Sequence, residues 1–333
     1  MSTNAFPLAI LLASLALAGI DAATGEEIVA EPAKAAAPAA KGGVADAERL
    51  LETGIERRMH ADWDGAREAY AQAVETLKAE LPRSDVRIAT ALAEFGAAEN
   101  ESGRYAEARA LFDEALELLQ LQDEPPVRHL AMAYNGIGYG HHHSGRFAEA
   151  IAAYEKAKPL YAASGGTDSL LYARLLSNMS ESYRLLDRLD EAEPLARESY
   201  EIAQGIDDID GRSLGMITNN LATLRFNQGR ADEAQALFEQ ALVTTEDALG
   251  SKHPQTASAL SNLGVVMYAQ GHAREAIVPL ERALDIMESL YGKDHPEVAY
   301  VLSNLEDVYR AAGEEKRASE ARARIDAMGG EGG

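Results

Sequence analysis

The ten residues GIGYGHHHSG, at positions 136–145, combine two residue types that often do chemistry. Alternate glycines suggest a loop that holds a phosphate group, and three consecutive histidines suggest a metal site. The phosphate loop is incomplete, because no strand is predicted before the glycines and no Lys-Ser/Thr pair follows them. Adjacent histidines on a helix point about 100° apart, so they do not chelate one ion as residues four apart do. We therefore expect at most trace affinity for nickel or zinc at His141–His143, and no functional metal site.

Other catalytic signatures are missing from the sequence. It contains no G-x-S-x-G, H-E-x-x-H or Walker motif, and it has no cysteine. Carboxylate pairs such as Glu314-Glu315 fall in predicted solvated turns, and no nucleophile is placed beside a base. We expect no enzymatic activity, no catalytic residues and no cofactor. An enzyme with a metal at His141–His143 is the most remote alternative.

Composition and charge narrow the class of protein. Helix-forming residues dominate the 333 positions, which favours an all-α fold. The 54 acidic and 31 basic side chains give a net charge of −23. Such a surface repels phosphate backbones, so we expect no binding to nucleic acid.

The N-terminal segment has the composition expected of a targeting signal. Residues 5–20, AFPLAILLASLALAGI, are uncharged and apolar, but shorter than the roughly 18–20 residues of a spanning helix. A small-x-small site before Gly19 predicts a signal peptide over 1–18, hence export to the periplasm or medium and no stable membrane insertion after cleavage. No basic residue precedes the apolar run, and residues 21–23 offer a competing cleavage site, so an N-terminal membrane anchor remains the alternative.

A segment without hydrophobic periodicity follows. Residues 19–46 are rich in Ala and Pro and are predicted to be a disordered linker, with the folded body starting near Val44. The folded domain is expected over 47–328, and a short disordered tail over 329–333.

The body of the chain repeats itself every 42 residues. Segments 252–276 and 294–318 match at this shift, and the frame extends backward without a gap. One column holds alanine in every unit, and others hold small residues. The alanine column is Ala66, Ala108, Ala150, Ala192, Ala234, Ala276 and Ala318; a second column is Gly54, Gly96, Gly138, Ser180, Ala222, Gly264 and Glu306. Seven alanines at one fixed spacing identify a structural repeat.

The sequence of each unit predicts two helices that are joined at a glycine such as Gly145. Apolar residues in 275–290 recur on one helical face, and small residues let facing helices approach closely. A glycine after one helix and a proline at the start of the next mark the joints between units. One helix pair cannot bury its own apolar face, so the units are expected to stack into a solenoid.

This pattern resembles the tetratricopeptide repeat (TPR), in the 42-residue form of kinesin light chains and many bacterial proteins. Residues 219–242 and 261–284 carry the resemblance best, and it covers about 47–325. It implies a right-handed α-solenoid of seven stacked helix-turn-helix repeats. GIGYGHHHSG is then the end of the first helix of repeat 3 and its turn, where Gly136 and Gly140 are extra and expected to loosen the helix.

Three departures from the repeat pattern stand out. Asp187 replaces the turn glycine of repeat 4. Glu306 and Arg322 in repeat 7 suggest a frayed, polar cap, and Ile325 stands where a small residue would meet an eighth unit.

Four positions of each first helix face away from the second helix, and we call them the inner stripe. They lie at about 100–160° from the small-residue column, and the resemblance implies that they line a concave groove. Repeats 1 and 2 supply Glu48, Glu52, Glu94 and Glu101, whereas repeats 3–6 are nearly neutral because Arg174 and Glu181 are expected to cancel.

A row of asparagines follows the inner stripe, at Asn178, Asn220, Asn262 and Asn304. An amide offers donors and an acceptor together, so such a row suits the backbone of an extended peptide. The resemblance to kinesin-light-chain-like repeats implies the same contact, while hydrogen bonding between neighbouring first helices is the alternative. The expected peptide-binding residues are Asn178, Asn220, Asn262, Asn304, Tyr139, His142, His143, Arg174, Arg184, Phe226 and Tyr268.

These observations predict a non-enzymatic scaffold for protein interactions. Its partner would be another protein, bound through an extended segment that is polar or aromatic at its centre and basic where it meets repeats 1 and 2. A self-assembling structural component of the cell envelope is the alternative.

Overall fold

The computed structural model describes residues 43–60 and 62–329, and every regular element in them is an α-helix. These residues divide into two compact units, 43–188 and 189–329, and the division of the chain falls within predicted repeat 4. The expected signal peptide, most of the expected linker and residues 330–333 lie outside the described residues. None of the helices described here combines the length and apolar character needed to cross a membrane.

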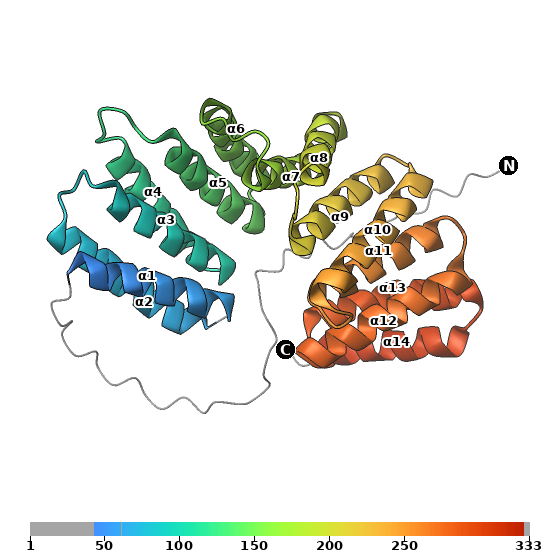
Figure 1. Ribbon diagram of the computed structural model, residues 1–333. Helices are drawn as coiled ribbons and strands as arrows, with labels where there is room; N and C mark the ends of the chain where they lie inside the picture. Colours follow the sequence, from blue (N-terminus) through green and yellow to red (C-terminus); the bar gives the residue numbers. More distant parts are fainter. Residues whose placement is uncertain (1–42, 61, 330–333) are drawn as a thin grey trace, which may run out of the picture. The chain divides into compact units, whose positions relative to one another are not determined.

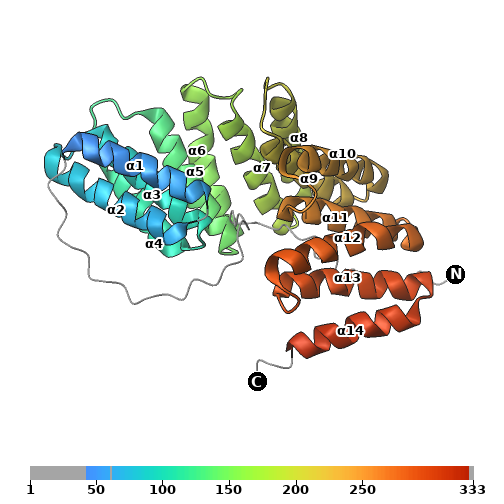
Figure 2. The ribbon, with the colours of Figure 1, turned by 60° about the horizontal axis from the view of Figure 1, so that its bottom comes forward.

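The N-terminal unit consists of successive helices in which each packs against the next (Figures 1 and 2). Its first helix begins at Val44, where the sequence places the start of the folded body. The helices are α1 (Val44–Met59), α2 (Trp63–Glu80), α3 (Val86–Glu101), α4 (Tyr105–Leu119), α5 (Val127–His143), α6 (Phe147–Ala163) and α7 (Leu170–Leu185).

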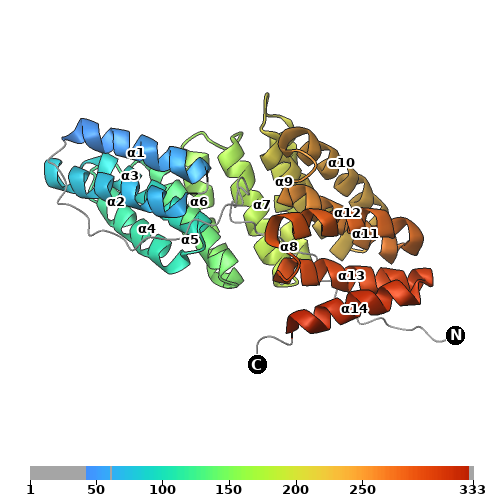
Figure 3. The same cartoon turned by 90° about the horizontal axis from the view of Figure 1, so that it is seen from below.

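The C-terminal unit continues the same arrangement, with α13 and α14 side by side at its end (Figure 3). Contacts between first helices also link α9 to α11 and α11 to α13. The helices are α8 (Leu189–Gln204), α9 (Gly211–Asn227), α10 (Ala231–Leu249), α11 (Pro254–Ala269), α12 (Ala273–Tyr291), α13 (Pro296–Ala312) and α14 (Glu315–Gly329).

The small-residue columns lie where paired helices touch. The seven members of the alanine column are all buried, as the repeat frame predicts. A Cβ atom added to Gly264 would lie 2.5 Å from Leu280 Cγ, and one added to Gly138 would lie 2.4 Å from the Tyr154 ring. The frame is therefore confirmed by packing, because a larger residue would push the second helix away.

The turns between paired helices repeat with the same period. Gly103, Gly145, Gly229, Gly271 and Gly313 all have positive φ values between 72° and 88°. Asp187 takes the equivalent place in repeat 4 with φ 58°. The chain therefore adopts the same left-handed turn there without the glycine that favours it.

Two expectations about local structure are wrong. Gly136 and Gly140 do not loosen their helix, since α5 runs unbroken to His143. They permit close packing instead: a Cβ on Gly136 would lie 2.2 Å from the Phe112 ring, and one on Gly140 would lie 2.8 Å from Asn100 Oδ1.

The last repeat is not frayed either. Glu306 is buried in α13 and its carboxylate pairs with Arg310 at 2.6 Å and with Arg322 of α14 at 3.6 Å. Ile325 packs partly buried against the core of the C-terminal unit. The unusual residues of repeat 7 therefore join its two helices through an ion pair.

Candidate functional site

The three adjacent histidines at the end of α5 each have a different partner. His141 Nε2 lies 2.8 Å from Arg109 Nη1, and His142 Nδ1 lies 2.9 Å from Ser182 Oγ. The ring of His143 instead packs on Tyr139, with centroids 4.0 Å apart. Among the described residues, no group of three or more His, Asp or Glu side chains could hold a metal ion.

Burial keeps these histidines neutral. The Ser182 hydroxyl donates to the Asn178 carbonyl oxygen, so its oxygen accepts a hydrogen bond from Nδ1–H of His142. Burial lowers the pKa of His142 against the opposing effect of Glu181, and Arg184 adds a smaller lowering. Burial, together with His142, lowers the pKa of His143 to about 3. The rings therefore serve as aromatic and hydrogen-bonding groups at neutral pH.

The inner stripe of the N-terminal unit carries a charge pattern different from the one expected. Glu181 is buried and receives two hydrogen bonds from Arg184, at 2.7 and 2.6 Å, so it does not cancel Arg174. Arg184, one of the expected peptide-binding residues, is buried in the same pair. Arg174 is exposed, while Asn178 and Tyr139 are half-buried. Arg174 is therefore an accessible cation on the inner stripe of repeats 3 and 4.

The acidic end of the inner stripe is partly neutralised. Arg58 of α1 lies 3.3 Å from the Glu94 carboxylate and 3.6 Å from that of Glu101. Glu48 lies 3.8 Å from Arg87, and Glu52 is exposed. Glu48 and Glu52 on α1 are therefore the acids best placed to meet a basic segment.

The asparagines of the C-terminal unit fall into two kinds. Asn262 is 1% exposed, and its Nδ2 donates to Oδ1 of Asn219 over 3.0 Å, from α11 to α9. This is the alternative role, a bond between neighbouring first helices. Asn220 and Asn304 are half-buried. Within the described part of the chain, Nδ2 of Asn304 has no hydrogen-bond partner.

The repeat frame explains this difference. Asn219 precedes Asn220 in α9, and the equivalent residue of α11 is Ser261. Its shorter side chain also leaves Oγ unpaired among the described residues. Asn219 is not predicted as a site residue from the sequence, although it directly precedes Asn220 of the asparagine row.

Two aromatic residues flank the asparagines of the C-terminal unit. Phe226 and Tyr268 are half-buried and pack against the apolar cores of their repeats. The rest of each ring remains accessible. These rings can therefore offer apolar contact beside the asparagines.

Comparisons with known proteins identify the repeat and the fold. A family model described as tetratricopeptide repeat matches residues 129–205 and 213–289, and a second model of the same description matches residues 88–120. Together the matches cover more than half of the chain. No curated protein matches the sequence significantly.

Solved structures at low sequence identity share the fold. Kinesin light chain TPR-like repeats of Podosopora anserina match with TM-score 0.53 and 21% identity, over 62% of this chain and 97% of theirs. A Rap protein complexed with Competence and Sporulation Factor matches with TM-score 0.64 and 15% identity, over 85% of this chain and 77% of that one. NprR in complex with its cognate peptide NprX matches with TM-score 0.59 and 15% identity, over the same shares.

Proposed function

The chain belongs to the tetratricopeptide repeat family, and we propose that it is a non-enzymatic scaffold whose inner stripe holds an extended segment of a partner protein. The segment would lie across the first helices and use its backbone for much of the contact. The export suggested by the N-terminal sequence would place this interaction outside the cytoplasm.

The observation that carries the proposal is the uncommitted amide of Asn304. The amide nitrogen of Asn262 donates a hydrogen bond to Asn219, whereas Asn304 Nδ2 has no partner in the described part of the chain. A polar group in that condition costs free energy until it meets an acceptor. Asn304 as a whole is half-buried, and its buried Nδ2 would reach a ligand once the amide turns. A peptide carbonyl supplies the missing acceptor.

Two further observations support a peptide as the ligand. Phe226 and Tyr268 place partly accessible rings on the same unit, which suits the side chains of a polar or aromatic segment. NprR has the same fold and is seen with its cognate peptide. In the N-terminal unit, taken by itself, exposed Glu48 and Glu52 favour a basic segment in the partner.

A selection from a random peptide library tests the proposal without a known partner. The purified protein, residues 43–333, would be the bait, and binding of enriched peptides would be measured by fluorescence anisotropy. We expect peptides that compete with one another for a single stretch. Failure to enrich any peptide, or enrichment unaffected by substitution of Asn304, Phe226 and Tyr268, would overturn the inner stripe as the binding surface.

A further inference from the structure

A buried carboxylate joins three helices at the boundary between repeats 1 and 2. Glu99 of α3 is 2% exposed. Its carboxylate accepts hydrogen bonds from Nε and Nη2 of Arg67 on α2, at 3.0 and 2.5 Å. It accepts another from Nε of Arg104 at the start of α4, at 2.6 Å. One acid therefore pairs with two arginines.

One repeat later the two arginines recur without the acid. The positions 42 residues after Arg67, Glu99 and Arg104 hold Arg109, His141 and Arg146. Arg109 Nη1 donates to His141 Nε2 at 2.8 Å, and its Nε pairs with exposed Asp113. Arg146 makes no hydrogen bond or ion pair with any side chain that the structure describes.

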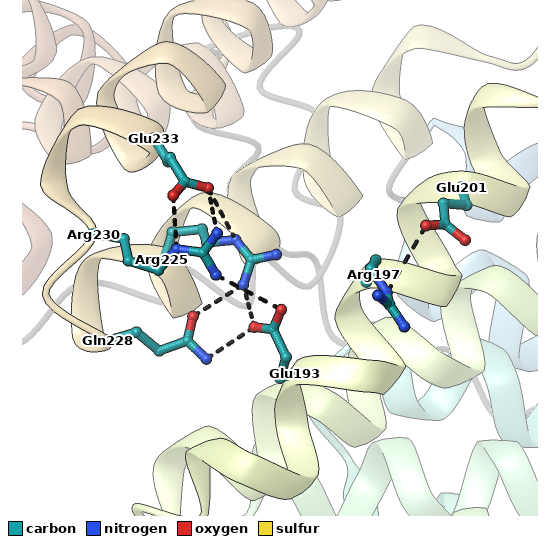
Figure 4. Close-up of polar contacts among 7 residues, drawn as sticks. All are labelled: Glu193, Arg197, Glu201, Arg225, Gln228, Arg230 and Glu233. Carbon is teal, nitrogen blue, oxygen red and sulfur yellow. Dashed lines mark hydrogen bonds and ion pairs between the residues drawn. The ribbon is translucent and has the colours of Figure 1, made fainter.

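A third set, in the C-terminal unit, again places a carboxylate beside two arginines. Glu193 stands in the column of Arg67, and Arg225 and Arg230 stand in those of Glu99 and Arg104. Figure 4 shows both guanidinium groups beside the Glu193 carboxylate. A carboxylate beside two guanidinium groups is thus found in both other sets, and in the third set Glu233 is a second carboxylate that pairs with both arginines.

A small cavity lies at the boundary that lacks the acid. Its walls include Asn100, Arg109, Gly140, His141 and Arg146. Two buried atoms of these residues, Asn100 Oδ1 and His141 Nδ1, have no partner within the described residues. A small cavity and two unpaired polar atoms therefore lie at the boundary where His141 replaces the acid found at Glu99.

The protonation of His141 leaves a donor for a ligand. Burial, together with Arg146 and Arg109, lowers the pKa of His141, against the weaker opposing effects of Glu149 and Asp113. The neutral ring accepts from Arg109 at Nε2, so its proton is on Nδ1. Asn100 Oδ1, an acceptor beside Gly140, suits a water molecule bound next to the ligand.

We propose that Arg109, His141 and Arg146 form a carboxylate-binding site, in which an external carboxylate takes the place that Glu99 fills one repeat earlier. Guanidinium groups bind carboxylates through charge-assisted hydrogen bonds, and Nδ1–H of His141 adds a third donor. The ligand is a free small carboxylic acid or an Asp or Glu side chain of a partner. The site is separate from the inner stripe and does not depend on the proposed function.

Arginine side-chain NMR tests the site directly. Acetate would replace chloride at constant ionic strength while the Nε–Hε signals are followed. Signals of Arg109 and Arg146 should shift saturably at millimolar acetate, while those of Arg67 and Arg104 stay still because Glu99 already occupies their site. Unchanged signals, or equal shifts in all four, would overturn the proposal.

Two variants distinguish acetate binding at this site from a general effect of salt on the arginine signals. His141→Glu should install the missing acid, raise the melting temperature and abolish the acetate response. Arg146→Gln, at an exposed position, should weaken acetate binding about tenfold or more through loss of a charge-assisted bond. A full acetate response in His141→Glu would contradict the proposal.

A final arm distinguishes the two sources of carboxylate. A short peptide with one glutamate, its glutamine counterpart and acetate would be titrated in turn. Tighter binding of the glutamate peptide than of acetate assigns the site to a partner's side chain, and the reverse order assigns it to a free acid. Equal binding of the glutamate and glutamine peptides, without a response to acetate, would overturn the site.

Discussion

Asn262 donates a hydrogen bond from Nδ2 to Oδ1 of Asn219, which joins two neighbouring first helices over 3.0 Å. The row of asparagines that looks uniform in the sequence is therefore not uniform in the structure. Asn262 holds helices together, whereas the amide nitrogen of Asn304 has no partner among the described residues. This contrast divides a member of the row that joins two helices from one whose amide nitrogen is uncommitted.

Asn262→Ala is expected to destabilise the protein. The change removes a buried hydrogen bond and leaves Asn219 Oδ1 without its donor, which costs about 1–3 kcal/mol. Asn304→Ala should change the free energy of unfolding by less than about 0.5 kcal/mol. Urea unfolding of the two variants measures the difference, and equal losses would contradict the division.

Gly264→Leu should overpack the pair α11 and α12. The added Cβ alone would approach Leu280 Cγ to 2.5 Å, so the helices must separate at a cost of about 1–3 kcal/mol. Val278→Leu, on the exposed side of α12, is the control and should be neutral. Similar unfolding curves for both variants would show that close helix approach does not set the repeat.

Asp187→Gly is expected to stabilise the turn of repeat 4. Asp187 has φ 58°, at a position that is glycine in five other turns. Relief of the left-handed conformation should raise the free energy of unfolding by about 0.5–1 kcal/mol. Asp187→Ala should lower it, because alanine lacks the local hydrogen bonding that helps aspartate at positive φ. Thermal and urea unfolding of both variants check the order.

Stability should fall in acid partly because of His143. The folded-state pKa of His143 is about 3, against about 6.5 in the unfolded chain. Between these values the unfolded state binds the extra proton, so the contribution is complete above pH 6.5 and declines toward pH 3. The slope is at most about 1.4 kcal/mol per pH unit.

His143→Asn removes this titration. Urea unfolding at pH 7, 6, 5 and 4 should show the wild-type protein losing stability more steeply than the variant. The gap between the two proteins should therefore narrow with acid. Parallel curves would mean that His143 is not held neutral by its surroundings.

The fold was predictable because close helix packing leaves a direct record in the sequence. The alanine column and the turn glycines must be small or left-handed in every repeat, so they appear at a spacing of 42. Gly136 and Gly140 were misread because their reason lies in another helix, in the Phe112 ring and Asn100.

The candidate site was less predictable than the fold. Glu181 pairs with Arg184 because residues three apart lie on the same side of a helix. The expectation that Glu181 cancels Arg174 came from adding charges along the inner stripe, which ignores this spacing. The bond from Asn262 to Asn219 depends on the offset between neighbouring first helices, which one repeat in isolation does not reveal.

The affinity of a selected peptide for Asn304→Ala tests the central claim most directly. Ser303→Ala, at the exposed neighbouring position, is the matched control. Loss of one amide contact should weaken binding about two- to tenfold in Asn304→Ala, with no change in melting temperature and none in the affinity of the control. If Asn304→Ala binds every selected peptide as tightly as the wild-type protein, the inner stripe does not hold the peptide through this asparagine and the account is contradicted.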